Sequence, residues 1–209
     1  MRAPGRVPPG RAGRLWLARR LGTAERGRDQ LDRKLRLLVQ DQQRMRILAE
    51  RARAEWRTAF READTWLLRA AVLGGQDAVR GAAAPSLVEV NVTWASEMGL
   101  TYPATVELAS TSGTVDHIDG NAALAPAATA FRVALLAGAR CGAAEEAVRL
   151  LELEVALTKR RLRALEKRWV PWLQAALRER ELVLEQSEQE DGIRTRRALA
   201  AAPKGGAGS

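Results

Sequence analysis

The sequence contains one cysteine, one histidine and few aromatic residues. Cys141 has no second cysteine with which to form a disulfide within the chain, and together with His117 it cannot supply the four ligands of a Cys/His zinc site. Both facts suit a reducing cytoplasm. Aromatic side chains make up 4% of the chain, although six of the nine are tryptophan. So few large side chains favour a narrow buried seam between long helices over a wide compact core.

Long apolar runs and nucleotide-binding loops are also missing. No run approaches the roughly 18–20 apolar residues that span a bilayer. The N-terminal stretch MRAPGRVPPGRAGR is basic and lacks the apolar segment of a signal peptide. No glycine-rich turn leads into Gly-Lys-Ser/Thr, so nucleotide hydrolysis by this chain alone is not expected. We therefore expect a soluble, non-enzymatic chain without a cofactor, which could still lie beside a membrane.

Arginine is abundant, and it dominates the charge. The chain carries 34 basic and 25 acidic residues, a formal net charge of +9, and only four of the basic residues are lysines. A basic surface suits nucleic acid, anionic lipid or an acidic protein cavity, and charge alone does not choose among them. The arginines are concentrated near both ends of the chain. The arginines near the ends include Arg6, Arg11, Arg14, Arg19, Arg20, Arg194, Arg196 and Arg197.

A 4-3 spacing of mostly apolar residues runs from Leu17 to Leu73 without an intervening proline. Because chance rarely keeps such a spacing in phase for so long, it predicts a single coiled-coil helix. At about 1.5 Å per residue this helix would be about 85 Å long. Its seam consists of Leu17, Leu21, Ala24, Arg28, Leu31, Leu35, Leu38, Gln42, Met45, Ala49, Ala52, Trp56, Ala59, Ala63, Trp66, Ala70 and Leu73.

The middle of the chain changes to a period of two. Apolar and polar residues alternate over 87–92 and again over 104–108, with Met98 and Gly99 between them. This pattern predicts two short strands joined in a hairpin. The stretch from Ser110 to Asn121 is typical of a loop. Asp116, His117 and Asp119 in this loop could be imagined as a metal or acid/base cluster. They lack the ligand pattern of a calcium loop, so a solvated polar turn is favoured.

A second helix is predicted to begin near Pro126, because proline is favoured in a first helical turn. Its seam is rich in alanine at the start and in tryptophan towards the end. The small residues would allow close approach near Trp56 and Trp66 if the two helices are antiparallel. The seam consists of Ala127, Ala130, Ala134, Ala137, Cys141, Ala144, Val148, Leu151, Val155, Thr158, Leu162, Leu165, Trp169, Trp172, Ala176, Glu179 and Val183.

The two seams are of matched length, so the predicted fold is mainly α. It is a long antiparallel two-helix coiled coil with a small β-hairpin element at the end opposite the termini. We expect an extended arm over 1–13, a first coiled-coil helix over 14–73 and a hairpin and loop element over 74–125. A second coiled-coil helix would follow over 126–200, and a disordered tail over 201–209.

Three residues of the second helix need separate interpretations. Cys141 falls on the seam, where a buried thiol behaves as a small apolar side chain. Pro171 removes a helical hydrogen bond and usually kinks the axis. That kink is either a tolerated defect in a long helix or a bend with a function. Trp172, beside it, could point outward to a partner.

Two stretches resemble the D subunit of V-type and A-type rotary ATPases. The first runs from Pro9-Gly10-Arg11 through Ala24, Gly27 and Leu31 to Leu38 and resembles the opening helix of that family. The second begins with Arg-Arg-Leu-Arg-Ala-Leu-Glu at 160–166, continues through Val170-Pro171, and ends at Ile193-Arg194. It resembles the family's Arg-Arg-Val-Asn-Ala-Leu-Glu and Ile-Pro segment. Arg163 stands where the family commonly has Asn, and Trp172 where it often has a basic residue.

The resemblance implies a central-stalk rotor shaft that couples ATP synthesis or hydrolysis to proton or sodium transport. The tip carrying both termini would enter the catalytic hexamer of A and B subunits. The hairpin end would meet the small F subunit of the stalk and the socket subunit above the rotor ring. The location would be the cytoplasmic face of a bacterial plasma membrane. Implied hexamer contacts are Arg6, Arg11, Arg14, Leu15, Arg19, Arg20, Pro171, Trp172, Arg194, Arg196 and Arg197; implied stalk and socket contacts are Val88, Val90, Val92, Val106 and Leu108.

Two other functions fit parts of the sequence. A prefoldin-like chaperone or scaffold has the same helix–hairpin–helix order, but would assemble through its hairpins without nucleotide-binding subunits. A nucleic-acid-binding coil fits the charge, yet no aromatic and basic platform or reading helix is apparent. Pro171 and the basic, proline-rich start favour the rotor.

Overall fold

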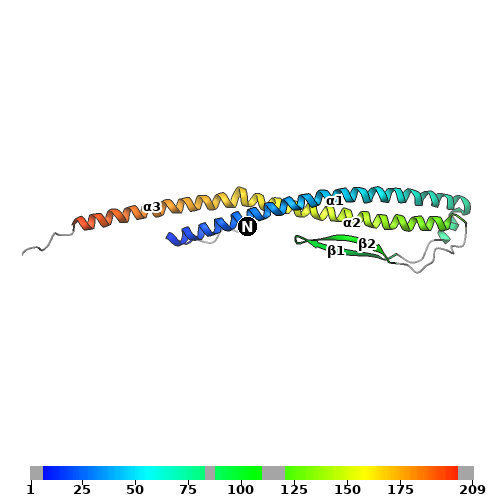
Figure 1. Cartoon of the computed structure of the whole chain (residues 1–209), viewed down its shortest axis with the longest axis horizontal. Coiled ribbons are helices and arrows are strands. Elements are labelled where there is room, and N and C mark those ends of the chain that lie inside the picture. The colour runs from blue at the N-terminus through cyan, green and yellow to red at the C-terminus, as the bar shows by residue number, and fades with distance from the viewer. Residues whose placement is uncertain (1–6, 83–87, 110–120, 202–209) are drawn as a thin grey trace, which may run out of the picture. The chain divides into compact units, whose positions relative to one another are not determined.

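The computed structural model describes residues 7–82, 88–109 and 121–201. Its elements are α1 (Gly10–Gly81), β1 (Val90–Glu97), β2 (Leu100–Leu108), α2 (Leu124–Ala164), the π-helical turn η2 (Leu165–Trp169) and α3 (Val170–Ala201) (Figure 1). This confirms the predicted fold class, two long helical stretches with a small antiparallel hairpin. The chain divides into two compact units, unit 1 (residues 1–33 and 158–209) and unit 2 (residues 34–157).

In unit 2, α1 and α2 lie antiparallel with a seam of small and aliphatic residues between them. One buried cluster joins Leu38 of α1 to Leu151 and Val155 of α2. A second joins Ala70 of α1 to Ala123 and Leu124. The buried positions on α1 in this unit, Leu38, Ala49, Ala63 and Ala70, all belong to the 4-3 spacing of the sequence.

Tryptophans of α1 lie on small residues of α2, as the sequence predicted. A Cβ on Gly138 would lie 3.0 Å from Nε1 of Trp56, so the indole rests on the bare backbone there. Trp66 packs against the cluster of Ala70, Ala123 and Leu124. Because each large ring meets a small residue across the seam, the two helix axes can stay close along this part of the coil.

Ion pairs across the seam follow the antiparallel register of unit 2. Lys34 Nζ lies 2.7 Å from Glu154 Oε1, and Arg46 and Arg53 pair with Glu152 and Glu145 at 2.6 and 2.7 Å. As the residue number on α1 increases, the residue number of its partner on α2 decreases, as it does in an antiparallel pair of helices. The pairs Arg46–Glu152 and Arg53–Glu145 are exposed and each contributes little stability, so the apolar seam holds the helices together and the ion pairs are consistent with its register.

The end of α1 contains a break at the predicted glycines. Gly75 has φ 72° and ψ 174°, outside the helical range, and the chain then continues as helix to Gly81. Residues 76–81 are therefore helical, whereas the sequence assigned them to the hairpin element. Asn121 Nδ2 donates to the carbonyl of Ala70 at 2.9 Å, and its Oδ1 accepts from the N–H of Ala123 at 3.0 Å. A Cβ on Gly74 would lie 2.4 Å from Asn121 Nδ2, so glycine is needed there.

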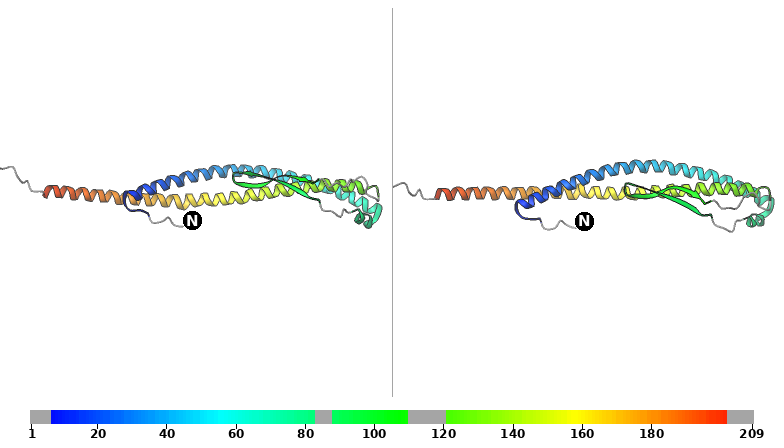
Figure 2. Two further views of the ribbon diagram at one scale, coloured as in Figure 1. Left: turned by 90° about the horizontal axis from the view of Figure 1, so that it is seen from below. Right: turned by 60° about the horizontal axis from the view of Figure 1, so that its bottom comes forward.

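The hairpin lies alongside the helices of unit 2. Strands β1 and β2 pair antiparallel, and the two-residue turn has positive φ at Met98 and Gly99, as a type I′ turn requires. Leu100 packs on the cluster of Leu38 and Leu151, so the turn contacts the seam (Figure 2). Tyr102 and Val106 of β2 are buried, whereas β1 is mostly exposed. Strand β2 thus faces the helices.

In unit 1, the first turns of α1 pack against α3. The buried cluster consists of Leu17, Ala24, Val170 and Leu173, and Arg11 pairs with Glu188 at 2.7 Å. Thr158 and Leu162 are buried where the sequence predicted the seam, and Thr158 Oγ1 has no hydrogen-bond partner among the described residues.

Beyond Leu165 the predicted seam is out of phase by one residue. The buried residues are Val170 and Leu173, each one position later than the predicted Trp169 and Trp172. The cause is the π turn at Leu165–Trp169, in which the N–H of Val170 donates to the carbonyl of Leu165. A π turn contains one more residue than an α turn, so the side chains that face α1 after it come one position later in the sequence than a regular helix would place them.

Pro171 explains why the π turn lies there. A proline in a regular helix has no N–H and clashes with the carbonyl four residues earlier. The widened turn just before it relieves that clash, because Pro171 directly follows a π turn and not a regular α turn.

Candidate interaction surfaces

Three of the predicted hexamer contacts, Arg19, Arg20 and Trp172, lie in unit 1 on an arginine–tryptophan surface, which consists of these residues with Trp16 and Trp169. The guanidinium carbon of Arg20 lies 5.2 Å from the ring centroid of Trp16 and 5.9 Å from that of Trp169. The rings of Trp169 and Trp172 stack with centroids 5.6 Å apart. Because Arg20 lies near two rings, its side chain is held by cation–π attraction.

A groove of about 710 Å³ runs along this surface. Its lining combines apolar and cationic side chains from the start of α1 with residues of the π turn. The lining residues are Pro8, Ala12, Leu15, Trp16, Arg19, Arg20, Thr23, Ala24, Leu165 and Trp169. Such a groove can receive a segment that has apolar side chains beside acidic ones.

The predicted hexamer contacts that the structure describes are all exposed. Arg14, Leu15, Arg19, Pro171 and Trp172 are exposed. Arg6 lies outside the described residues.

The arginines near the C-terminal end make their contacts within α3. Arg194 lies 3.7 Å from Asp191 and 3.8 Å from Glu190, and Arg196 donates to the carbonyl of Gly192. These contacts are all within α3, at positions beyond Glu188, the residue opposite Arg11. Among the described residues the ion pairs and hydrogen bonds given for Arg194 and Arg196 stay within α3, and the meeting of the two arginine sets at one tip stays a prediction.

The hairpin residues predicted to bind the stalk and socket partners divide into two groups. Val90 and Val92 are exposed on β1. Val106 is only 5% exposed because it packs within unit 2, and Val88 and Leu108 are half-buried. Val106 therefore supports the hairpin's own packing, and the accessible apolar residues of the hairpin belong to β1.

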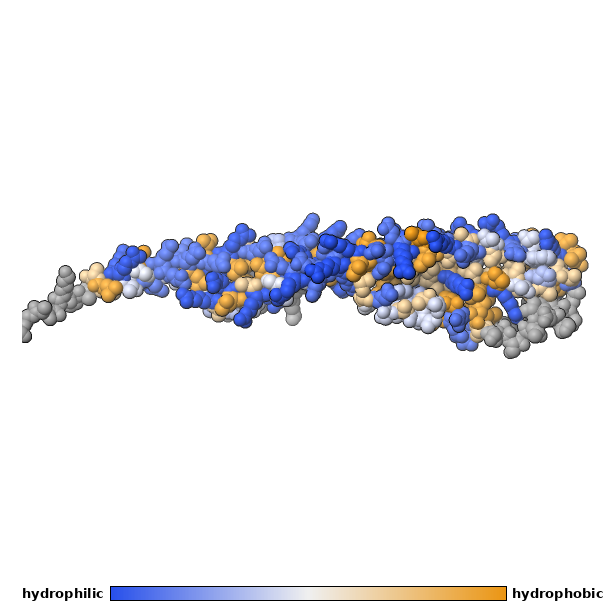
Figure 3. Space-filling model, viewed as in Figure 1, coloured by the Kyte–Doolittle hydropathy of each residue, from blue (hydrophilic) through white to orange (hydrophobic). Residues whose placement is uncertain are grey.

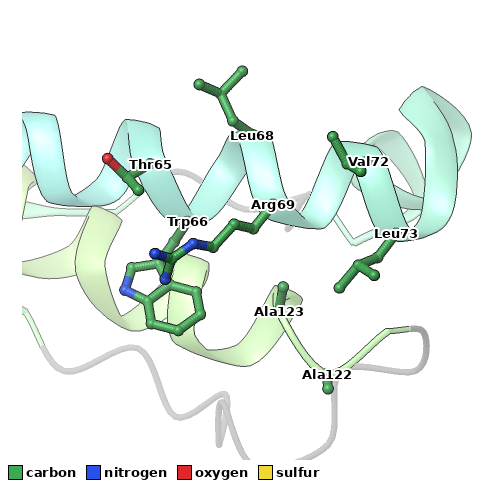
Figure 4. Close-up of a pocket in the computed structure, with 8 residues that line it drawn as sticks. All are labelled: Thr65, Trp66, Leu68, Arg69, Val72, Leu73, Ala122 and Ala123. Carbon is green, nitrogen blue, oxygen red and sulfur yellow. The ribbon is translucent and has the colours of Figure 1, made fainter.

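Sequence reasoning missed an apolar groove near the end of α1 in unit 2. This groove, of about 540 Å³, is called the apolar groove below (Figure 4). Val72 is 85% exposed, and Leu68 and Leu73 are also exposed. The apolar groove is lined by Thr65, Trp66, Leu68, Arg69, Val72, Leu73, Ala122 and Ala123. The signal in the sequence was that Leu68 and Val72 are apolar although they lie off the 4-3 spacing.

Apolar surface continues onto the start of α2. Val133 and Leu135 are exposed, and on the face shown in Figure 3 apolar residues are more frequent over unit 2 than over unit 1. Contiguous exposed apolar surface of this kind marks a binding site for another protein or for a membrane.

The start of α2 is the stretch of the described residues that most resembles a membrane span. By length and composition alone, the helix from Leu124 could span a membrane. Alanines, each only weakly apolar, raise the average hydropathy of this stretch without forming a conspicuous run. Arg132 and Arg140 lie in this stretch, and each would cost about 2.5–3.5 kcal/mol at the centre of a bilayer. The apolar surface therefore suits a protein partner better than lipid.

The surroundings of Cys141 in the seam determine the reactivity of its thiol. Its Sγ donates to Oε1 of Glu145 at 3.3 Å, and Arg53 donates to the same oxygen. Burial raises the pKa of the Cys141 thiol, and the bond to Glu145 acts in the same direction. The hydrogen bond from Arg53 lowers the pKa of Glu145. Cys141 is thus a protonated, buried thiol with low nucleophilicity.

No group of three or more His, Cys, Asp or Glu side chains that could hold a metal ion occurs among the described residues. The loop residues Asp116, His117 and Asp119 lie outside the described part of the chain.

Comparisons with known proteins show which family the chain is similar to. The family of ATP synthase D subunits matches residues 15–200. The V-type ATP synthase D subunit of Thermotoga neapolitana is 29% identical over 194 residues, covering 91% of this chain and 96% of the relative. The A-type ATP synthase D subunit of Methanopyrus kandleri is 29% identical over 196 residues, covering 91% of this chain and 84% of the relative.

Proposed function

The chain belongs to the family of ATP synthase D subunits, and we propose that it is the central rotor shaft of a V/A-type rotary ATPase. In this role it transmits torque between the catalytic A/B hexamer and the membrane rotor ring. It thereby couples ATP synthesis or hydrolysis to transport of protons or sodium ions. The observation that carries the proposal is the family match over residues 15–200, which includes both long helices and the hairpin.

The paired helices suit the transmission of torque. In each unit α1 packs on a partner helix through buried side chains, with Leu17 on Leu173 in unit 1 and Leu38 on Leu151 in unit 2. Two helices packed along a seam resist bending and twisting better than one. The chain itself carries out no catalysis in this proposal, and the nucleotide sites belong to the A and B subunits.

Unit 1 is the part proposed to enter the hexamer. A shaft that turns must not be locked in one orientation, so its contacts should be many and individually weak. The exposed arginines and the arginine–tryptophan surface fit this requirement, because exposed charged contacts are each worth little. Trp172 is the exception, a large exposed ring that could serve as a stronger contact.

Unit 2 is the part proposed to meet the small F subunit of the stalk and the socket subunit of the rotor ring. The apolar groove offers Trp66, Val72 and Leu73, and β1 offers Val90 and Val92. Because these residues are apolar and exposed, burying them against a partner is favourable at about 25 cal/mol per Å². The assembled location would be peripheral, at the cytoplasmic face of a bacterial plasma membrane.

A pull-down of the tagged chain from its native host, followed by mass spectrometry, tests this function. The proposal predicts recovery of large nucleotide-binding subunits together with small stalk subunits. Val72→Glu should reduce the recovery of the F and socket subunits and leave the catalytic subunits bound. Glu62→Gln, an exposed change on α1 away from Val72, is the matched control. Recovery of the chain in an assembly without nucleotide-binding subunits would instead favour a prefoldin-like scaffold.

A further inference from the structure

The outer edge of β1 is an open strand edge on unit 2. Strand β2 faces the helices through Tyr102 and Val106, and β1 lies on its far side (Figures 1 and 2). The β1 side chains Val90 and Val92 are exposed, and Trp94 is 58% exposed. Apolar side chains thus lie along a strand that has one neighbour only among the described residues.

The backbone groups of Val90 and Val92 point away from β2. The N–H of Ala109 donates to the carbonyl of Glu89, so this pair is hydrogen-bonded. Bonded and non-bonded pairs alternate along an antiparallel ladder, so Val90, paired with Leu108, and Val92, paired with Val106, direct their N–H and C=O groups outward. Four backbone groups are therefore available to another strand.

This edge lacks most of the features that protect strand edges from pairing. Proteins protect them with proline, lysine, short length or bulges. Strand β1 has eight residues and contains neither proline nor lysine. The register shift between Thr93 and Trp94 comes after the two open positions. An edge of this length is a ready template for strand addition.

The charge of the hairpin indicates the occupant. In a chain of net charge +9, residues 88–109 contain Glu89, Glu97 and Glu107 and no lysine or arginine. No ion pair among the described residues involves Glu89 or Glu107, and both are exposed. A strand added beside β1 would place side chains next to Glu89, and Glu107 on β2 adds to the negative charge of the hairpin, so a basic strand is favoured here.

Charge also argues against a second copy of the chain. A second β1 strand contains neither lysine nor arginine, so it would bring no positive charge to the edge beside Glu89 and would add the negative charges of its own hairpin. The edge is therefore suited to a strand from a different protein.

We infer that β1 receives an extended, basic segment of another subunit, which adds a third strand to the hairpin through the backbone of Val90 and Val92. This inference rests on the proposed function in one respect, that the segment belongs to the same rotary complex. Recognition by strand addition takes its affinity from main-chain hydrogen bonds and its specificity from alternate side chains.

Residue-resolved hydrogen exchange tests the inference. In the isolated chain, the amides of Asn91 and Thr93 should exchange slowly, because they bond β2, and those of Val90 and Val92 should exchange fast. In the complex purified through a tag on the full chain, Val90 and Val92 should become at least about tenfold slower, whereas Asn91 and Thr93 should change little. Fast exchange of Val90 and Val92 in a complex that contains the nucleotide-binding subunits would overturn the inference and leave the proposed function intact. Slow exchange in the isolated chain, with a dimeric mass by light scattering, would assign the edge to a second copy and also overturn it.

Two variants separate the backbone and charge contributions. Val92→Pro removes the outward N–H and should abolish the added protection at Val90, whereas Val92→Thr keeps the N–H and should retain it. Slow exchange at Asn91 and Thr93 shows that the hairpin of each variant is still folded. Glu89→Lys should reduce the protection of Val92 about fivefold, from a loss of about 1 kcal/mol of cross-strand attraction. Glu55→Lys on α1 makes the same charge change away from the edge and should leave the protection of Val92 unchanged. An equal loss of protection in Glu89→Lys and Glu55→Lys would contradict the charge argument.

Discussion

The π turn before Pro171 leads to a prediction in which one deletion is rescued by one substitution. Removing Lys167 takes one residue out of the turn and lets the helix continue as a regular α-helix. The same residues, Val170 and Leu173, then still face α1, because the deletion compensates the one-residue shift. Pro171 is then left in the interior of a regular helix, where its ring clashes with the carbonyl four residues earlier.

The magnitude follows from that clash. A proline in a helix interior costs about 3 kcal/mol. Deletion of Lys167 alone should therefore lower the free energy of unfolding of unit 1 by about 3 kcal/mol. With Pro171→Ala in addition, the penalty should fall to within about 1 kcal/mol of the single Pro171→Ala variant. The coupling between the two changes should be about 3 kcal/mol, far above the error of a double-mutant cycle.

Urea unfolding followed by tryptophan fluorescence and by circular dichroism at 222 nm measures all four proteins. Three of the six tryptophans, Trp16, Trp169 and Trp172, lie in unit 1 and report on its unfolding. Additive effects of the deletion and of Pro171→Ala would refute the argument that the π turn exists to accommodate the proline.

Three other predictions concern the seam. Leu173→Ala should destabilise unit 1 by about 2–5 kcal/mol, because Leu173 is fully buried, whereas the exposed Leu182→Ala should change it by less than about 0.5 kcal/mol; urea unfolding measures both. Gly138→Val should lower the melting temperature because its side chain would meet the Trp56 ring, and adding Trp56→Ala should restore part of the loss; an unchanged melting temperature for Gly138→Val would count against the close approach. Because the pKa of Glu145 is lowered in the folded chain, its contribution is present above its ordinary value near 4.5 and is lost as the pH falls through the folded value. The urea midpoint should thus drop more between pH 7 and pH 3 in the native protein than in Arg53→Met, and equal drops would exclude this pair as a cause.

The sequence was sufficient to predict the helices, because the 4-3 spacing reports which side chains face a partner. The buried residues of α1 from Leu17 to Ala70 all lie on that spacing. The 4-3 spacing did not identify the buried residues after Leu165, because a π turn cannot be recognised from the spacing of apolar residues alone. Val170 and Leu173 are apolar, but so are Trp169 and Trp172, so both stripes were possible and only the backbone decides between them.

The interaction surfaces were harder to predict for a related reason. An exposed apolar residue such as Val72 has the same residue type as a buried seam residue, so composition does not distinguish the two. Its exposure depends on where the partner helix ends. Val106 and Val92 are paired across the hairpin and have the same chemistry in the sequence, yet one is buried and the other exposed. The difference arises from which strand faces the helices, and strand alternation alone does not contain that information.

Rotation of the chain within the complex is the most direct test of its role as a shaft. Arg57→Cys on the exposed surface of α1, in a Cys141→Ser background, would carry a bead while the catalytic subunits are fixed to a surface. The account predicts that ATP drives continuous rotation of the bead in one direction. A complex that hydrolyses ATP while the bead stays still would contradict it.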